Sequence, residues 1–135
     1  MTLTRSLLVY GVTLPIFFAI DLVWLGLIAR AFYQRHIGHL LSPHVTWWAA
    51  ILFYLLFIAG IVFFAVRPAL ESGSATRALV YGAFFGLLAY ATYDLTNQAT
   101  MRDWPVVVTV VDLAWGSVLS ATVAYLSYQV SSRLL

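Results

Sequence analysis

Long apolar stretches separated by short polar connectors are the dominant pattern of the chain. Each stretch has about the 20 residues that a helix needs to cross ~30 Å of hydrocarbon. Short connectors force neighbouring helices to run antiparallel. The pattern therefore predicts an all-α, integral membrane four-helix up-down bundle in which residues 1–135 form a single polytopic domain. The expected spans cover residues 6–29, 46–66, 78–100 and 105–130.

Composition supports lipid as the main solvent of this chain. Hydrophobic residues make up 63% of it and charged residues 9%, whereas soluble domains average roughly 25% charged residues. The basic residues are all arginines and are spread singly, so the chain lacks the basic stripe of a nucleic-acid-binding protein. The first apolar stretch is longer than a signal-peptide core and contains Asp21, so we interpret it as a true span.

The orientation in the membrane follows from the arginines of the connectors and termini. The end that carries both termini has four arginines, and the opposite end has three. Because cytoplasmic segments are enriched in arginine and lysine, this difference favours cytoplasmic termini by a small margin.

Three carboxylates lie inside the expected spans, on the first, third and fourth. Asp21 lies nine residues before Arg30, Asp94 lies eight before Arg102, and Asp112 lies seven after the proline that begins the last span. These span ends share one membrane face because the spans alternate in direction. At 1.5 Å per residue, all three carboxylates are expected roughly 10–14 Å below that face.

Short sequence similarities suggest that related helix faces meet at one pocket. The first span contains DLVWLG and the fourth contains DLAWGS, so Trp24 and Trp115 each follow an aspartate by three residues. We expect a binding site formed by Asp21, Asp94, Asp112, Asn97 and Gln98, with support from Trp24, Trp115, Tyr90, Tyr93 and Arg102.

The cost of burying charge limits what these carboxylates can do. An ionised aspartate at a span centre costs ~2.5–3.5 kcal/mol on insertion scales, and intramembrane ionisable groups usually mark function. The favoured hypothesis is a site that binds or conducts a proton, a cation or a cationic group, as in transport. The alternatives are a lipid-modifying enzyme, or a subunit of one, that uses the carboxylates as acid and base or as metal ligands, and a purely structural partner of another membrane protein.

Other residues leave further alternatives open. Arg102 either forms an interfacial pair with Asp103, which would cap the last span, or lies over Asp94 or an anionic headgroup. His36, His39 and His44 share the first connector, where interfacial histidines are common. No histidine pair lies within a span to hold haem, and the chain has no cysteine, so the sequence names no metal-ligand residues and leaves the identity of a cofactor unknown.

Small residues predict close helix packing on the third and fourth spans. Gly82 and Gly86 form a small-xxx-small pair, and Gly116 and Ser120 form another. Such faces let helices approach closely. They could pack within the chain or against a second copy of it, giving a homo-oligomer surrounded by membrane lipids.

The motifs YDLTNQAT, DWP and DLAWG, with the early DLVWLG, resemble those of an uncharacterised bacterial membrane family, domain of unknown function 2177. The resemblance covers essentially the whole chain. It implies a small multi-pass protein of the bacterial inner (cytoplasmic) membrane, and it carries no catalytic role to transfer.

Overall fold

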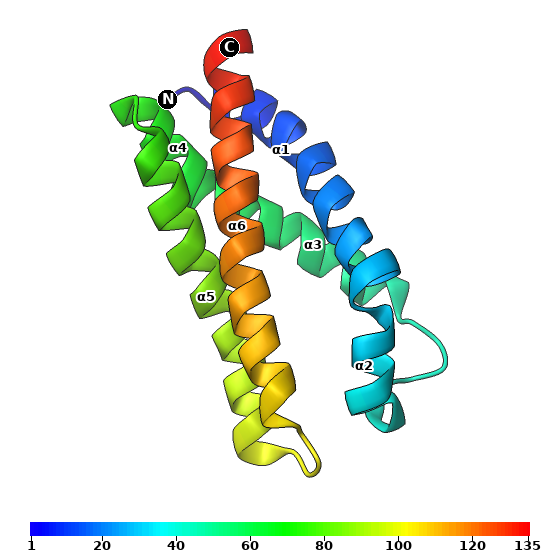
Figure 1. Ribbon diagram of the computed structural model, residues 1–135. Coiled ribbons are helices and arrows are strands. Elements are labelled where there is room, and N and C mark those ends of the chain that lie inside the picture. The colour runs from blue at the N-terminus through cyan, green and yellow to red at the C-terminus, as the bar shows by residue number, and fades with distance from the viewer.

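The computed structural model describes residues 1–135 as helices joined by short turns. The predicted all-α membrane bundle with four spans is confirmed, since four helices are long and apolar enough to cross a membrane. Both termini lie at one end of the molecule, and the turn between the last two spans lies at the other (Figure 1). The spanning helices are Leu3–Ile28, Trp47–Ser72, Ala75–Thr100 and Val106–Leu134.

The spanning helices are divided by local changes in helical geometry. The first continues from α1 into a single π-helical turn, η1, and the second contains another such turn, η3. The expected connector at residues 30–45 is partly helical. The elements are α1 (Leu3–Val23), η1 (Trp24–Ile28), α2 (Arg30–Ile37), the 3₁₀ turn η2 (Gly38–Leu40), α3 (Trp47–Ile61), η3 (Val62–Val66), α4 (Arg67–Ser72), α5 (Ala75–Thr100) and α6 (Val106–Leu134).

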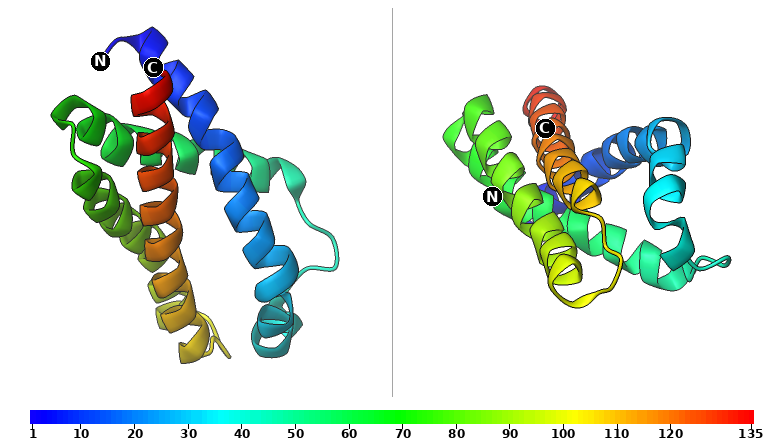
Figure 2. Two further views of the ribbon diagram at one scale, coloured as in Figure 1. Left: turned by 45° about the horizontal axis from the view of Figure 1, so that its top comes forward. Right: turned by 60° about the horizontal axis from the view of Figure 1, so that its bottom comes forward.

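The helices do not all run parallel to one axis. α5 and α6 are antiparallel neighbours along most of their length, and α1 packs on α6. The continuous helix from α3 to α4 crosses the other three obliquely (Figures 1 and 2). This crossing separates the α2 end of α1 from α5, and side chains from several helices converge in that region.

Local sequence explains where the helices begin and end. The hydroxyls of Thr2 and Ser74 accept backbone N–H groups at the starts of α1 and α5, at 3.1 and 3.2 Å. α4 ends at Gly73, whose φ of 65° is left-handed and favours glycine. The expected Asp103 cap is wrong, because Asp103 has a φ of 60° in the turn and Pro105 is the N-cap of α6.

Glycines bring α5 and α6 into backbone contact. A Cβ added to Gly82 would lie 2.6 Å from the Ser120 carbonyl oxygen, and one added to Gly86 would meet the Gly116 carbonyl and the Ser120 side chain. The two small-residue faces are therefore occupied by each other within one chain. Self-association through them stays a prediction, and it would require α5 and α6 to separate.

Replacing Gly86 with alanine is expected to destabilise the bundle by about 1–3 kcal/mol, because the new methyl group would overlap backbone atoms that cannot move aside. Gly11→Ala is the matched control, since nothing lies within 4 Å of a Cβ at that position. Thermal unfolding in detergent micelles measures both. Equal unfolding temperatures for the two variants would contradict this close approach.

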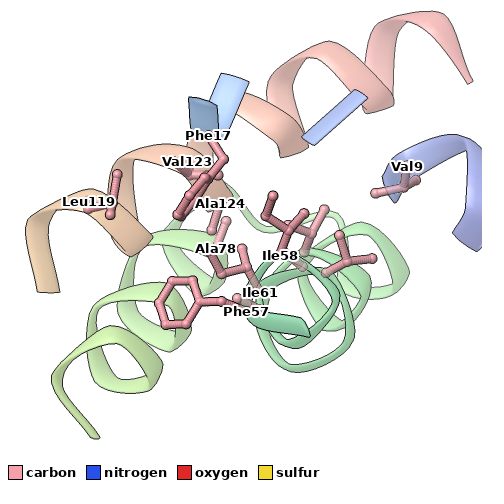
Figure 3. Packing of buried hydrophobic residues seen from close by; sticks show 13 residues of the cluster. Val9, Phe17, Phe57, Ile58, Ile61, Ala78, Leu119, Val123 and Ala124 are labelled. Carbon is pink, nitrogen blue, oxygen red and sulfur yellow. The ribbon is translucent and has the colours of Figure 1, made fainter. Parts of the chain in front are cut away.

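The apolar core occupies the half of the molecule nearer the termini. Fully buried side chains from α1, α3, α5 and α6 meet there, including Phe17, Ile58, Ala78 and Leu119, and Figure 3 shows several of them converging. The intramembrane carboxylates lie beyond this core, toward α2. The half nearer the termini thus buries apolar side chains and a few hydroxyls, such as those of Thr13 and Ser127, whereas the carboxylates lie in the other half.

Candidate functional site

The carboxyl groups of Asp94 on α5 and Asp112 on α6 lie side by side. Asp94 is 0% exposed, and neither of its carboxyl oxygens has a hydrogen-bond donor. Asp112 is 7% exposed. Two adjacent ionised carboxylates repel each other strongly in a medium of low dielectric. The pair can be accommodated when one proton is shared between the two groups or when a cation lies against them.

Tyr33 connects Asp112 to α2. Its hydroxyl donates to Asp112 Oδ1 at 2.5 Å. Burial and the adjacent carboxylate raise the pKa of the Tyr33 hydroxyl above its usual value. The hydroxyl therefore stays protonated at physiological pH and remains a donor. α2 reaches this position because its apolar residues, including Tyr33 and the buried Ile37, lie one helical turn apart and face the bundle.

Trp24 and Trp115, one from each repeated motif, stack on each other, and each donates a hydrogen bond within the site. The rings of Trp24 and Trp115 stack with centroids 4.3 Å apart and planes at 9°. Trp115, three residues after Asp112, donates to Asp21 Oδ1 at 3.3 Å. Trp24, three residues after Asp21, donates at 3.3 Å to the Tyr33 hydroxyl that binds Asp112. Trp115 of the second motif therefore serves the first motif's carboxylate directly, whereas Trp24 is connected to Asp112 only through Tyr33, the residue that donates to it.

The π-helical turn η1 lies beside the stacked tryptophans. It begins at Trp24, and the backbone N–H of Ala29 donates to the Trp24 carbonyl at 2.7 Å, five residues back. Such single turns are frequent at functional sites because they change the direction of the side chains that follow. Here η1 also connects the first span to α2, which carries Tyr33.

A cavity of about 720 Å³ extends from Asp21 and Asp112 to α2. Most of its wall is apolar or aromatic, and Trp24, Tyr90, Tyr93 and Trp115 all line it. Asp94 is not part of the wall and lies behind Asp112. The wall also contains residues that the sequence did not suggest: Arg30, Tyr33, Gln34, Phe53 and Tyr54.

The three aspartates thus form a pair and a separate third group. Asp94 adjoins Asp112, whereas Asp21 is connected to that pair through the stacked indoles and Tyr33. No group of three or more His, Cys, Asp or Glu side chains could hold one metal ion. A three-carboxylate metal centre, which the enzyme alternative included, does not match this arrangement.

Three of the expected polar residues lie outside this arrangement. Gln98 bonds elsewhere: its amide N–H donates to the Trp104 carbonyl at 2.8 Å, and its carbonyl accepts from Thr109 at 2.9 Å. Asn97 lies beside Tyr93 and makes no hydrogen bond to a carboxylate. Arg102 is exposed and pairs with no acidic side chain, so it does not lie over Asp94.

Gln98 instead closes the turn between α5 and α6. Trp104 donates its indole N–H to Thr109 at 3.1 Å, which completes a ring of hydrogen bonds around this turn. Gln98→Leu is expected to lower the free energy of unfolding by about 1–3 kcal/mol, because the buried Thr109 and Trp104 groups lose partners. Thermal unfolding in micelles measures this loss. A variant with wild-type stability would contradict the structural role.

Tyr33 and Tyr54 are the main site residues that the sequence pattern did not reveal. Tyr33 belongs to a segment interpreted as a connector, although the spacing of Tyr33 and Ile37 is a signal for a helix that packs on the bundle. Tyr54 lies on the second span, where residues 47–66 contain no charged side chain that would indicate a site. Its ring lies beside Asp21 and lines the cavity, so α3 contributes to the site as well as to the core.

Comparison with known proteins places the chain in a family. No curated protein and no solved structure gives a match. One family model does match, described as "Predicted membrane protein (DUF2177)", and it covers residues 6–129, which include the three intramembrane aspartates and the residues that connect them. This 135-residue multi-pass membrane protein therefore belongs to the DUF2177 family, the family that its aspartate motifs resemble.

Proposed function

We propose that this protein binds or conducts a proton, a cation or a cationic group at its intramembrane carboxylates. The observation that carries the proposal is the Asp94–Asp112 pair: Asp94 is completely buried without a donor, against a second carboxyl group. Such a pair needs a positive partner. In the bacterial cytoplasmic membrane, which the motif resemblance implies, that partner would exchange with one aqueous phase or both.

The energetics favour a functional pair over a purely structural one. A structural polar network gains stability when its buried groups are satisfied. Asp94 instead has no donor on either oxygen other than a proton shared with Asp112, and a buried group that lacks a donor typically costs about 1–3 kcal/mol. An arrangement with that cost is expected where the group must capture and release a ligand.

The cavity provides the route to the pair. It reaches Asp112, and the Tyr33 hydroxyl lies on that carboxylate. A proton or cation entering from the α2 side would meet Asp112 before Asp94. Arg30 also lines this cavity and is exposed. Because Arg30 is exposed, water and salt screen its positive charge, so it opposes the entry of a cation only weakly.

The lipid-modifying alternative has less support from this geometry. An Arg102 side chain over an anionic headgroup beside the carboxylates would have supported it, but Arg102 does not line the cavity. Arg30 does, so a variant of that mechanism would have to use Arg30 instead. A metal-dependent version would need more ligands in one place than the chain provides.

Proton flux into proteoliposomes tests the proposal. Purified protein is reconstituted around a pH-sensitive dye, and a potassium diffusion potential drives protons inward. We expect flux above that of protein-free vesicles for the wild type and no excess flux for Asp112→Asn. Asp103→Asn is the matched control, because the same change is made at an exposed turn residue, and it should retain wild-type flux. Excess flux that persists in Asp112→Asn would refute the role of the pair.

A further inference from the structure

The environment of Asp21 differs from that of the Asp94–Asp112 pair. Asp21 is 4% exposed, yet it lines the cavity directly. Its Oδ1 accepts a hydrogen bond from Trp115 at 3.3 Å, and the Tyr54 hydroxyl lies within hydrogen-bonding reach of the same carboxylate. Tyr54 and Tyr90 also lie close enough to Asp21 to interact electrostatically with its carboxylate. Asp21 is thus a nearly buried carboxylate that faces an open space between aromatic rings.

The chemistry of this wall matches one class of cation. Aromatic faces attract cations through the ring quadrupole, and carboxylates next to such faces recognise ammonium groups. A small hard cation such as Mg²⁺ or Ca²⁺ prefers six or more oxygen ligands. The wall around Asp21 supplies mainly aromatic carbon in place of such a shell. A cation that carries its own apolar surface therefore fits this environment better than an inorganic ion does.

The size and charge of the cavity also favour a cation that carries apolar surface. Its volume of about 720 Å³ lies within the ~300–1,000 Å³ typical of small-molecule sites. Arg30 is the only basic residue in the wall, and it forms no ion pair with Asp21 or Asp112. The carboxylates at the inner end of the cavity therefore remain free to meet a positive group.

We propose that the cavity binds an organic ammonium ion with apolar substituents. The nitrogen lies against Asp21 among the rings of Tyr54, Tyr90 and Trp115, and the apolar part lies along the remaining wall toward α2. The inference rests on the proposed function, because it names the cationic group that the carboxylates serve. The ammonium group could belong to a free amine from the aqueous phase or to the choline or ethanolamine headgroup of a lipid.

Quenching of tryptophan fluorescence tests the proposal, because Trp24 and Trp115 both line the cavity. The protein in maltoside micelles is titrated with benzyltrimethylammonium, with its neutral carbon analogue neopentylbenzene, and with a short-chain phosphatidylcholine. Saturable quenching by the free ammonium ion, at least about tenfold tighter than by the neutral analogue, is expected from a charge-assisted contact. Tighter binding of the choline lipid than of the free ion would assign the site to lipid headgroups.

Variants locate the binding. Asp21→Asn should weaken ammonium binding at least about tenfold, since it removes the charge facing the cation. Tyr54→Leu should weaken it about 2- to 30-fold, the range expected for one cation–π contact. Tyr81→Leu makes the same change at a tyrosine outside this cavity and should retain wild-type affinity. Circular dichroism confirms that each variant is folded.

The outcomes separate this inference from the proposed function. Equal affinity for the neutral analogue, or no saturable ammonium binding by folded wild-type protein, would overturn the organic-ammonium site. This titration uses only the wild-type protein, so its result does not depend on whether a variant folds. Proton flux that depends on Asp112 would survive that result and leave the proposed function intact. Conversely, ammonium binding that depends on Asp21, in a protein without proton flux, would keep this site and refute proton conduction.

Discussion

Asp94→Asn is expected to abolish proton flux while leaving the protein at least as stable as the wild type. Asparagine has nearly the same shape, and its amide can donate to Asp112 without carrying a titratable proton. The variant removes a buried acidic group whose oxygens have no donor, so the free energy of unfolding should be unchanged or rise by up to about 1–3 kcal/mol. Flux assays and chemical unfolding in micelles measure the two effects.

The opposite pattern would identify a structural network. If Asp94 holds the helices together, Asp94→Asn should lower stability, and flux should be absent from the wild type as well. Asp103→Asn again serves as the control, because Asp103 is exposed and forms no ion pair. Loss of stability without loss of flux in Asp94→Asn would contradict the proposed role of this carboxylate.

Trp115→Leu is expected to cause the largest loss of stability among the site variants, about 2–3 kcal/mol. The indole of Trp115 stacks on Trp24 and supplies the donor to Asp21. Truncating it removes packing and an aromatic pair and leaves a nearly buried carboxylate unsatisfied. Chemical unfolding of the purified variant measures the loss.

Trp47→Leu provides the comparison for Trp115→Leu. Trp47 is 65% exposed at the start of α3, and substitutions at such surface positions usually change stability by no more than about 0.5 kcal/mol. Similar losses for both variants would show that the Trp24–Trp115 stack contributes no more than an exposed interfacial ring.

The depth of the carboxylates could be predicted from the sequence because it depends on helix geometry alone. The rise per residue is fixed, and short connectors make the spans antiparallel. Asp21, Asp94 and Asp112 consequently lie in the same half of the molecule, beyond the apolar core that contains Phe17 and Leu119.

The lateral grouping of the carboxylates could not be predicted in the same way. It depends on how far each helix rotates and tilts, and the oblique helix from α3 to α4 changes those angles for its neighbours. The motif similarity around Trp24 and Trp115 suggested a shared pocket. It could not show that Trp115 donates to Asp21 while Trp24 donates to Tyr33, because those contacts depend on how the two helices are rotated toward each other.

Polar residues near the end of α5 were the least predictable part of the site. Gln98 lies one turn after Asp94, which suggested a role in orienting the carboxylate. The competing partners, the Trp104 carbonyl and Thr109, are brought within reach only when the turn before α6 folds back. Tyr33, in contrast, was not expected in the site but belongs to it. It reaches Asp112 only because α2 packs against the bundle.

Infrared difference spectroscopy tests the central claim most directly, namely that Asp94 and Asp112 hold one proton between them. In cation-free protein near neutral pH, a shared proton predicts the carbonyl stretch of a protonated carboxylic acid, which shifts in deuterium oxide. That band should shift or disappear in both Asp94→Asn and Asp112→Asn, because the proton loses the second carboxylate that accepts it. A wild type without the band, or a band that keeps its wild-type frequency in both variants, would contradict the claim.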